Sequence, residues 1–179
     1  MVFSPSFAYS EAIYEAFKKK YPKIKSILQK PSMNASQKNE FLKSFSEDED
    51  KYLVAFSVLG GIFSEGIDLT GDKLIGAVVV GIGMPQLSFE REAIAEYYTD
   101  KMDSGIEYAY LYPGMNRVLQ AAGRVIRTET DKGVIVLIDD RFNDPLYRKS
   151  APKLWGKMKF LPNAKVLKEI LERFWSESN

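Results

Sequence analysis

The chain has 179 residues, of which 45% are hydrophobic and 27% are charged, the composition of one soluble globular domain with a full core. Its 25 basic and 24 acidic residues leave a net charge of +1, so no overall field draws the protein to nucleic acid or to an anionic membrane. Cysteine and histidine are absent, which excludes disulfides, thiolate nucleophiles, Ser-His-Asp triads and the usual ligands of zinc and iron–sulfur clusters. The sequence shows no membrane-spanning stretch and no secretory leader, so we expect a cytoplasmic protein without a membrane partner.

The first half of the chain alternates short apolar runs with helical patterns. The opening "MVFSPSF" predicts the end of a strand that enters a Ser-Pro-Ser turn, and this abrupt start suggests a fragment of a longer polypeptide. A helix follows in "YSEAIYEAFKKKY", and "KIKSILQ" predicts a short strand. The next helix can begin at Asn34, with Gln37 three residues later as its capping-box partner.

The second half repeats this alternation. The buried strand "YLVAFSV" leads through the glycine-rich turn "LGGIFSEGIDLTGDKL" to the strand "IGAVVVGIG". A long amphipathic stretch from Ser88 to about Ser104 and a helix from about Met115 to Ile126 precede the strand "GVIVLID", and "NAKVLKEILERFW" predicts a last helix. Strands that alternate with helices predict an α/β fold with a parallel sheet covered on both faces, in which ligands bind beyond the carboxyl ends of the strands.

Two arginines close the helix before the last strand, in "QAAGRVIRTETDKGVIVLID". At a spacing of three residues Arg124 and Arg127 would share one helix face, with Gln120 one turn earlier. Gly123 removes a side chain directly before Arg124 and so allows a ligand or another backbone to come close. A structural salt-bridge role is the common explanation for two such arginines, and an anion site is the alternative.

The turn "GGIFSEGIDL" is the second candidate. Its glycines permit backbone conformations that can direct N–H groups at a phosphate, and Asp68 can accept a hydrogen bond from a ribose hydroxyl or hold an arginine. Taken alone, the turn can equally be structural. Both motifs are expected to reach the same end of the sheet.

These residues carry a resemblance to a known family. "FSVLGGIFSEGIDLTGDKLIGAVVVGIGMP" resembles motif V, and "QAAGRVIRTETDKGVIVLIDDRF" resembles motif VI, of the XPD/DinG-type branch of superfamily 2 helicases. "MVFSPSF" is similar to the motif IV strand and turn of that branch, and the likeness weakens after about Arg148. The resemblance implies a RecA-like three-layer sandwich with a mostly parallel sheet, built as a single domain over residues 1–179.

The same resemblance implies a function and its residues. The chain would be the C-terminal, second RecA-like motor domain of an ATP-dependent DNA helicase that travels 5′ to 3′ along single-stranded DNA. The resemblance assigns roles to three groups of residues. The residues expected at the γ-phosphate are Arg124, Arg127 and Gln120, and those expected in motif V and beside the nucleotide are Glu65, Gly66, Asp68 and Gly123. The residues expected to contact DNA are Ser4, Ser6 and Ser64.

The cofactors and partners follow from the same resemblance. The sequence contains no G-x-x-x-x-G-K-[ST] loop and no metal-binding carboxylate motif, so ATP and Mg²⁺ are expected to bind mainly to the N-terminal motor domain of the same polypeptide. We therefore expect no metal site in this chain and no ATP hydrolysis by this domain alone. The competing hypothesis is a nucleotide-independent docking module for nucleic acid or protein that keeps the RecA-like fold.

The segment from 141 to 173 is basic, with nine Lys or Arg against three acidic residues. Its "WGKMKF" mixes aromatic and basic side chains, as in grooves that stack bases and hold phosphates. The alternative is that Trp155 and Phe160 pack in the core while the lysines stay in solvent.

Overall fold

The computed structural model describes residues 1–45, 52–65, 73–126, 131–155 and 158–177, without the side chains of Glu65 and Leu154. Within these ranges, none of the helices is long and apolar enough to cross a membrane.

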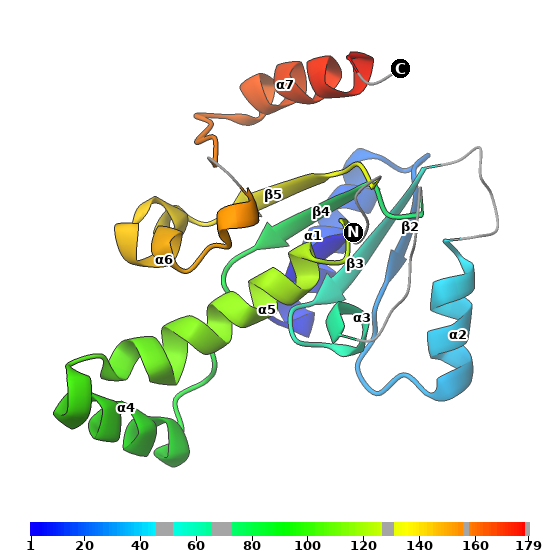
Figure 1. Cartoon of the computed structure of the whole chain (residues 1–179). Coiled ribbons are helices and arrows are strands. Elements are labelled where there is room, and N and C mark those ends of the chain that lie inside the picture. The colour runs from blue at the N-terminus through cyan, green and yellow to red at the C-terminus, as the bar shows by residue number, and fades with distance from the viewer. Residues whose placement is uncertain (46–51, 66–72, 127–130, 156–157, 178–179) are drawn as a thin grey trace.

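Five parallel strands form one sheet at the centre of the molecule (Figure 1). The strands are β1 Val2–Ser4, β2 Lys25–Leu28, β3 Leu53–Val58, β4 Gly76–Val80 and β5 Val134–Ile138. Their order across the sheet is β2-β3-β1-β4-β5, and every neighbouring pair is parallel. The shortest strand, β1, lies in the middle, where Phe3 pairs with Ser57 on one side and Val79 on the other. This arrangement confirms the parallel α/β sheet that the alternating pattern predicted.

The helices connect these strands as the sequence pattern indicated, with additional short segments. The helices are α1 Phe7–Lys20, α2 Ala35–Lys43, α3 Ile62–Glu65, α4 Phe89–Met102, α5 Tyr112–Ala122, α6 Pro145–Lys149 and α7 Ala164–Ser176. A π-helical segment Glu107–Leu111 precedes α5, and 3₁₀ turns cover Asp140–Asn143 and Lys153–Trp155.

Side-chain caps explain where several helices begin. Ser6 caps α1 by accepting from the Tyr9 N–H, and Ser88 caps α4 in the same way from the Arg91 N–H. At α2 the Asn34 side chain accepts from the Gln37 N–H while the Gln37 side chain accepts from the Asn34 N–H, both at 2.9 Å. The capping box predicted from the sequence is thus confirmed, and it satisfies two N–H groups that a helix start leaves unpaired.

Helices cover both faces of the sheet. On one face, Phe17 of α1 packs on Phe56 of β3 with 5.4 Å between ring centroids. On the other face, Phe3, Val79 and the inner side of α5, including Val118, form the main core. Because neighbouring residues of a strand point to opposite faces, the apolar strands supply side chains to both layers. The three-layer arrangement is confirmed.

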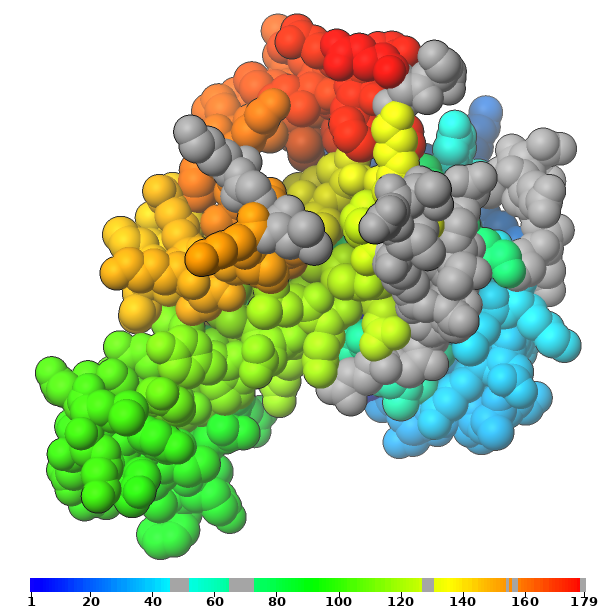
Figure 2. Space-filling model, in the orientation of Figure 1, coloured from blue at the N-terminus to red at the C-terminus, as the bar shows by residue number. Residues whose placement is uncertain are grey.

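A helical arm, residues 87–112, leaves the body between β4 and α5. Figures 1 and 2 show its green helix α4 projecting away from the sheet. No residue of α4 is buried, so the expected amphipathic stretch is a solvent-exposed helix that presents no buried stripe to the sheet. Inside the arm, the rings of Tyr98 and Tyr108 stack 4.0 Å apart, so aromatic contacts hold its two segments together.

The helix with the arginine motif ends earlier than predicted. We expected it to reach Ile126, but α5 ends at Ala122 and Gly123 caps it by donating its N–H to the Leu119 carbonyl. Arg124 therefore lies in the turn after the helix, and the prediction that it shares a helix face with Arg127 is wrong at Arg124. The physical reason is that the chain must leave the helix axis here to bury Val125, which is 3% exposed.

Candidate functional site

The segment after β3 begins with a sharp glycine turn. Gly60 has a φ of 69°, a left-handed conformation that other residues rarely adopt. The Gly61 N–H donates back to the Val58 carbonyl at 3.1 Å, which closes the turn. The buried amide of Gln29, at the end of β2, accepts from the Val58 N–H at 3.1 Å. The start of the segment that resembles motif V is therefore anchored to the neighbouring strand.

The short helix α3 continues this segment and is packed from outside by α2. Phe63 of α3 stacks on Phe41 of α2 with ring centroids 4.1 Å apart. Ser64 is fully buried, and its hydroxyl donates to the Gly61 carbonyl at 2.8 Å. Buried rings on one side and a closed hydroxyl bond on the other leave α3 little freedom to shift on its own.

The segment that resembles motif VI contacts the segment that resembles motif V through Arg124. Its Nε donates to the Ser64 carbonyl at 3.0 Å, across 60 residues of sequence. A hydrogen bond from Nε constrains the plane of the guanidinium, and a charged donor makes a stronger bond than a neutral one. The structure thus shows a direct contact between the two motif segments, which the sequence alone only predicted to lie at the same end of the sheet.

Arg117 is a site residue that the sequence reasoning missed. It lies on α5, and its terminal NH1 donates to the Gly83 carbonyl at 2.7 Å. A Cβ added at Gly60 would lie 3.0 Å from Arg117 Nε, so the side chain runs directly against the glycine turn. The available signal was its spacing, since Arg117 precedes Arg124 by seven residues, two turns along the helical pattern.

The helix α5 crosses the sheet from the carboxyl ends of the strands to their amino ends. Arg117 bonds to Gly83, which follows β4, while Val125 lies against Gly133, which precedes β5. We expected the arginine segment and the turn after β3 to reach the same end of the sheet. The two segments do meet, at the bond from Arg124 to the Ser64 carbonyl, although Val125, the next residue, lies against Gly133 before β5. The cause is the length of α5: eleven residues of helix rise about 16 Å, roughly the length of a five-residue strand.

The other residues of the arginine motif lie beside this turn. Gln120 and Gly123 are both exposed. A Cβ at Gly123 would meet only the Leu119 and Gln120 carbonyls within 4 Å among the described atoms. No distant element of the described chain thus uses the space that this glycine leaves.

The three serines assigned to DNA lie in different environments. Ser4 and Ser64 are fully buried, which speaks against direct DNA contact by their side chains in this arrangement. The Ser4 hydroxyl has no hydrogen-bond partner among the described atoms. Ser6 is exposed at the start of α1, where its oxygen accepts from the Tyr9 N–H at 3.2 Å. Ser6 therefore combines a capping role with an accessible hydroxyl.

Several of the sequence-predicted residues cannot be placed. Arg127, Gly66 and Asp68 lie outside the described residues, and so does the side chain of Glu65. The backbone of Glu65 ends α3, directly after the residue that Arg124 contacts.

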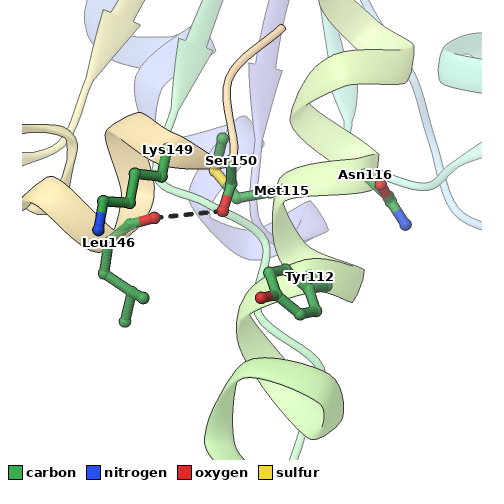
Figure 3. Close-up of a pocket in the computed structure, with 6 residues that line it drawn as sticks. All are labelled: Tyr112, Met115, Asn116, Leu146, Lys149 and Ser150. Carbon is green, nitrogen blue, oxygen red and sulfur yellow. Dashed lines mark hydrogen bonds between the residues drawn. The ribbon is translucent and has the colours of Figure 1, made fainter. Parts of the chain in front are cut away.

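A small cavity near α5 does not gather polar groups. It has a volume of about 330 Å³ and lies between α5 and α6, bordered by Tyr112 and Leu146. Figure 3 shows Asn116 and Lys149 pointing away from each other. The Ser150 hydroxyl donates a hydrogen bond to the Leu146 carbonyl at 3.2 Å. Without convergent polar groups, this cavity does not resemble a nucleotide site.

A larger apolar groove, about 870 Å³ in volume, separates β5 from α7. Trp155 is partly buried against the core beside this groove, as the core-packing alternative predicted. Phe160 is 48% exposed and carries the Arg148 guanidinium 4.2 Å above its ring, contrary to that alternative. The two aromatic residues of the basic segment therefore have different environments.

One ion pair stands at the carboxyl end of β5. Asp139 accepts from Arg141 Nε at 2.9 Å and from Arg141 NH2 at 2.7 Å. These hydrogen bonds hold the pKa of the Asp139 carboxyl below its usual value and raise the pKa of the Arg141 guanidinium. In the part of the chain that the structure describes, no three or more carboxylates gather in a group suited to a metal ion.

Comparison with known proteins gives one family. The family described as helicase C-terminal domain matches residues 1–158, which includes both motifs and every element up to the last 3₁₀ turn.

Curated relatives and solved structures agree with this match. The chain is 29% identical over 80% of its length to a regulator of telomere elongation helicase 1 homolog of Caenorhabditis briggsae, and 25% identical over 97% to an ATP-dependent DNA helicase CHL1 of Debaryomyces hansenii. It is 36% identical over half its length to an ATP-dependent DNA helicase DinG of Photobacterium profundum. The chain spans only 15%, 24% and 13% of these relatives. Two solved structures share its fold. The one named XPD helicase has a TM-score of 0.61 and 24% identity, over 89% of this chain and 28% of its own. The one named XPD apo has a TM-score of 0.62 and 21% identity, over 83% of this chain and 30% of its own.

Proposed function

The chain belongs to the helicase C-terminal domain family, and from this membership we propose that it is the second motor domain of an ATP-dependent DNA helicase. The residues 1–179 form a single RecA-like domain of a longer polypeptide, in which α7 extends past the matched range. The partner domain is the N-terminal motor half of the same polypeptide, and the substrate is single-stranded DNA, followed in the 5′ to 3′ direction. The names of the relatives support the helicase activity, and the motif V and VI residues support the choice of branch.

One contact carries this proposal: the bond from Arg124 to the Ser64 carbonyl. A motor domain must link the residues that sense nucleotide to those that grip DNA. Here the segment resembling motif VI donates directly to the backbone of the segment resembling motif V. A mere docking module has no need for a charged, oriented bond between these two segments.

In the proposed site, the guanidiniums of Arg124 and Arg127 face the γ-phosphate of ATP across the interdomain cleft. A loose phosphoryl-transfer transition state spreads negative charge over the γ-oxygens, and a planar guanidinium can donate to two of them at once. Arg124 is suited to this because its Nε bond to Ser64 constrains the guanidinium plane. Gln120 is exposed one turn before Arg124 and senses the nucleotide, and Gly123 leaves room for the ligand to approach.

This chain supplies only one half of that site. Its sequence has no phosphate-binding loop, so we assign the binding of ATP and Mg²⁺ mainly to the N-terminal motor domain. When bound, Mg²⁺ neutralises charge on the β- and γ-phosphates. The contribution of this domain is charge stabilisation by arginine, and alone it should not hydrolyse ATP.

The DNA track follows the loops at the motif V side of the domain. We assign Glu65, Gly66 and Asp68 to the coupling of nucleotide state to DNA grip, and the exposed hydroxyl of Ser6 to a phosphate of the strand. Ser4 and Ser64 support these loops from the core instead of contacting DNA through their side chains.

Replacement of Arg127 in the full-length polypeptide tests this function. Arg127→Ala should lower the rate of DNA-stimulated ATP hydrolysis by about 10³-fold or more, because an arginine finger supplies that order of rate enhancement. Arg127→Lys should recover little, since an ammonium cannot donate to two oxygens in a planar fork. The measurement is steady-state ATP turnover with saturating single-stranded DNA.

The matched control is Arg173→Ala on α7, which removes an arginine outside the family match. Turnover in this variant should equal that of the unaltered protein. Near-normal turnover in both Arg127 variants would mean that the arginine pair is structural, and no ATP turnover in the unaltered protein would contradict the motor assignment.

A further inference from the structure

Two loops at the carboxyl end of the sheet meet on the side chain of Arg117. Gly60 follows β3 and Gly83 follows β4, and both have positive φ, at 69° and 62°. A Cβ at Gly60 would lie 3.0 Å from Arg117 Nε and 3.1 Å from its Cδ, and one at Gly83 would lie 3.7 Å from the same Cδ. The guanidinium closes the contact by donating to the Gly83 carbonyl at 2.7 Å. Arg117 thus lies where a larger residue at Gly60 could not be accommodated without a shift.

The segment of motif V is therefore held at two places by the same part of the chain. Arg117 packs against Gly60 in the turn after β3, and Arg124 donates to the carbonyl of Ser64 four residues later. The interior of the segment is rigid, because the Ser64 N–H and hydroxyl both bond to the Gly61 carbonyl. A shift of α5 must then move this segment as a unit, since both of its arginine contacts originate on α5 or on the turn that ends it.

We propose that Arg117 is a positioning residue that couples the motif V segment and the loop after β4 to the movement of α5. The inference rests on the proposed function, in which nucleotide contacts Arg124 and Arg127 beyond the end of that helix. Arg117 touches neither nucleotide nor DNA. It transmits a displacement of α5 to the two loops on which the DNA track is built.

Arginine is the side chain that this role requires. Its Nε and Cδ lie 3.0 Å and 3.1 Å from the position of a Cβ at Gly60, while NH1 donates to the Gly83 carbonyl. Lysine carries a compact ammonium at the end of a flexible stem, so it can reach one loop with its charge but has no second nitrogen to place beside the other. A positioning role thus predicts poor rescue by lysine, whereas a general need for positive charge predicts good rescue.

The test uses the full-length polypeptide with Arg117→Ala and Arg117→Lys. The control is Arg91→Ala, because NH1 of Arg91 also donates to a partly buried backbone carbonyl, that of Ala109 at 3.2 Å, but within the arm. The first readout is the ratio of ATP turnover with and without single-stranded DNA. The second is hydrogen exchange at the amides of Gly61 and Ser64, whose bonds depend on the shape of the motif V segment.

We expect Arg117→Ala to lower the DNA stimulation ratio about tenfold, within the range of mutations that alter coupling between sites, with faster exchange at both amides. Arg117→Lys should restore little of the stimulation ratio or of the slow amide exchange, and Arg91→Ala should leave the ratio and the exchange unchanged. An equal effect of Arg117→Ala and Arg91→Ala on the ratio, or unchanged exchange at Gly61 and Ser64, would overturn the inference. If the unaltered protein shows no DNA-stimulated turnover, the proposed function fails, and the exchange comparison alone then decides whether Arg117 holds the two loops. If Arg117→Ala does not fold, the same two measurements on Arg117→Lys, compared with the unaltered protein, test the inference.

Discussion

Asp139 shows how one side chain can stabilise the end of a strand. Its carboxylate accepts from the Arg141 N–H at 2.9 Å and from two guanidinium nitrogens of the same residue. The side chain of Asp139 is 14% exposed, so water competes with these bonds only in part. The bonds begin the 3₁₀ turn after β5 and set the direction in which the chain leaves the sheet.

The lowered pKa of Asp139 makes its contribution depend on pH. Hydrogen bonds from Arg141 favour the ionised carboxylate in the folded protein. Stability from a carboxyl with a lowered folded pKa is present above the unfolded pKa of about 3.9 and is lost as the pH falls through the folded pKa. Asp139→Asn should therefore lower the free energy of unfolding by about 1 kcal/mol at pH 7, and this difference should disappear at an acidic pH below the folded pKa.

Urea denaturation at both pH values measures this effect. The control is Glu172→Gln, which removes a surface ion pair with Lys168 at 3.6 Å whose side chains are 65% and 76% exposed. That change should have almost no effect at either pH, because exposed ion pairs contribute little. A loss in Asp139→Asn that persists unchanged at the acidic pH, where the carboxyl is protonated, would show that the carboxylate charge is not the source.

At the scale of elements, the arm depends on the close approach of α4 to the π-helical segment. A Cβ at Gly105 would collide with the Ala95 carbonyl and with Thr99 Oγ1, both on α4. The glycine thus lets the chain turn back tightly enough to stack Tyr108 on Tyr98. Because no residue of α4 is buried, these contacts are the main ones that hold the arm together.

Gly105→Ala should therefore separate the two parts of the arm. Forcing a methyl group into a tight contact typically costs about 1–3 kcal/mol, and the stacked tyrosines should become more exposed. The measurements are the melting temperature and the near-ultraviolet circular dichroism of the tyrosines. Gly76→Ala is the matched control, because its Cβ would meet only the Val134 carbonyl at an ordinary 3.5 Å. Equal effects of the two substitutions would contradict the close approach.

At the scale of the whole molecule, the positive and negative charges nearly cancel but are concentrated in separate segments. The net charge is +1, yet the segment from 141 to 173 has nine basic and three acidic residues, and the exposed α4 begins with Glu90 and Glu92. Any grip on a DNA strand must therefore come from a few local phosphate contacts instead of a long-range field.

The binding of single-stranded DNA should accordingly be weak and depend on salt. With about two to four phosphate contacts, Z, the logarithm of the affinity should fall with the logarithm of the salt concentration at a slope of about −0.7Z. Ser6→Ala should weaken binding without changing the slope, because a hydroxyl donates a hydrogen bond to phosphate but neutralises no charge. The measurement is titration of a labelled oligonucleotide at several salt concentrations.

Ser88→Ala is the control, since Ser6 and Ser88 are both helix-capping serines and each loss should cost a similar amount of stability, about 1 kcal/mol. Only Ser6→Ala should alter DNA binding. A flat salt response, or equal effects of the two variants, would contradict the placement of the DNA track and favour the docking module.

The sequence alone determined the features that depend on neighbouring residues. The apolar runs predicted five parallel strands, and the capping box at Asn34 and Gln37 is present as predicted. Side-chain periodicity and capping act within a few residues, so a single sequence contains them completely. The motifs also sufficed to identify the family.

Only the tertiary structure decided where those segments meet. The contact between Arg124 and Ser64 joins residues 60 apart, and that between Arg117 and Gly83 joins residues 34 apart. The end of α5 at Ala122 and the burial of Ser4 also follow from packing against the sheet. Such contacts depend on the order of the strands and on the length of a helix relative to the sheet it crosses, and no local pattern in the chain specifies either.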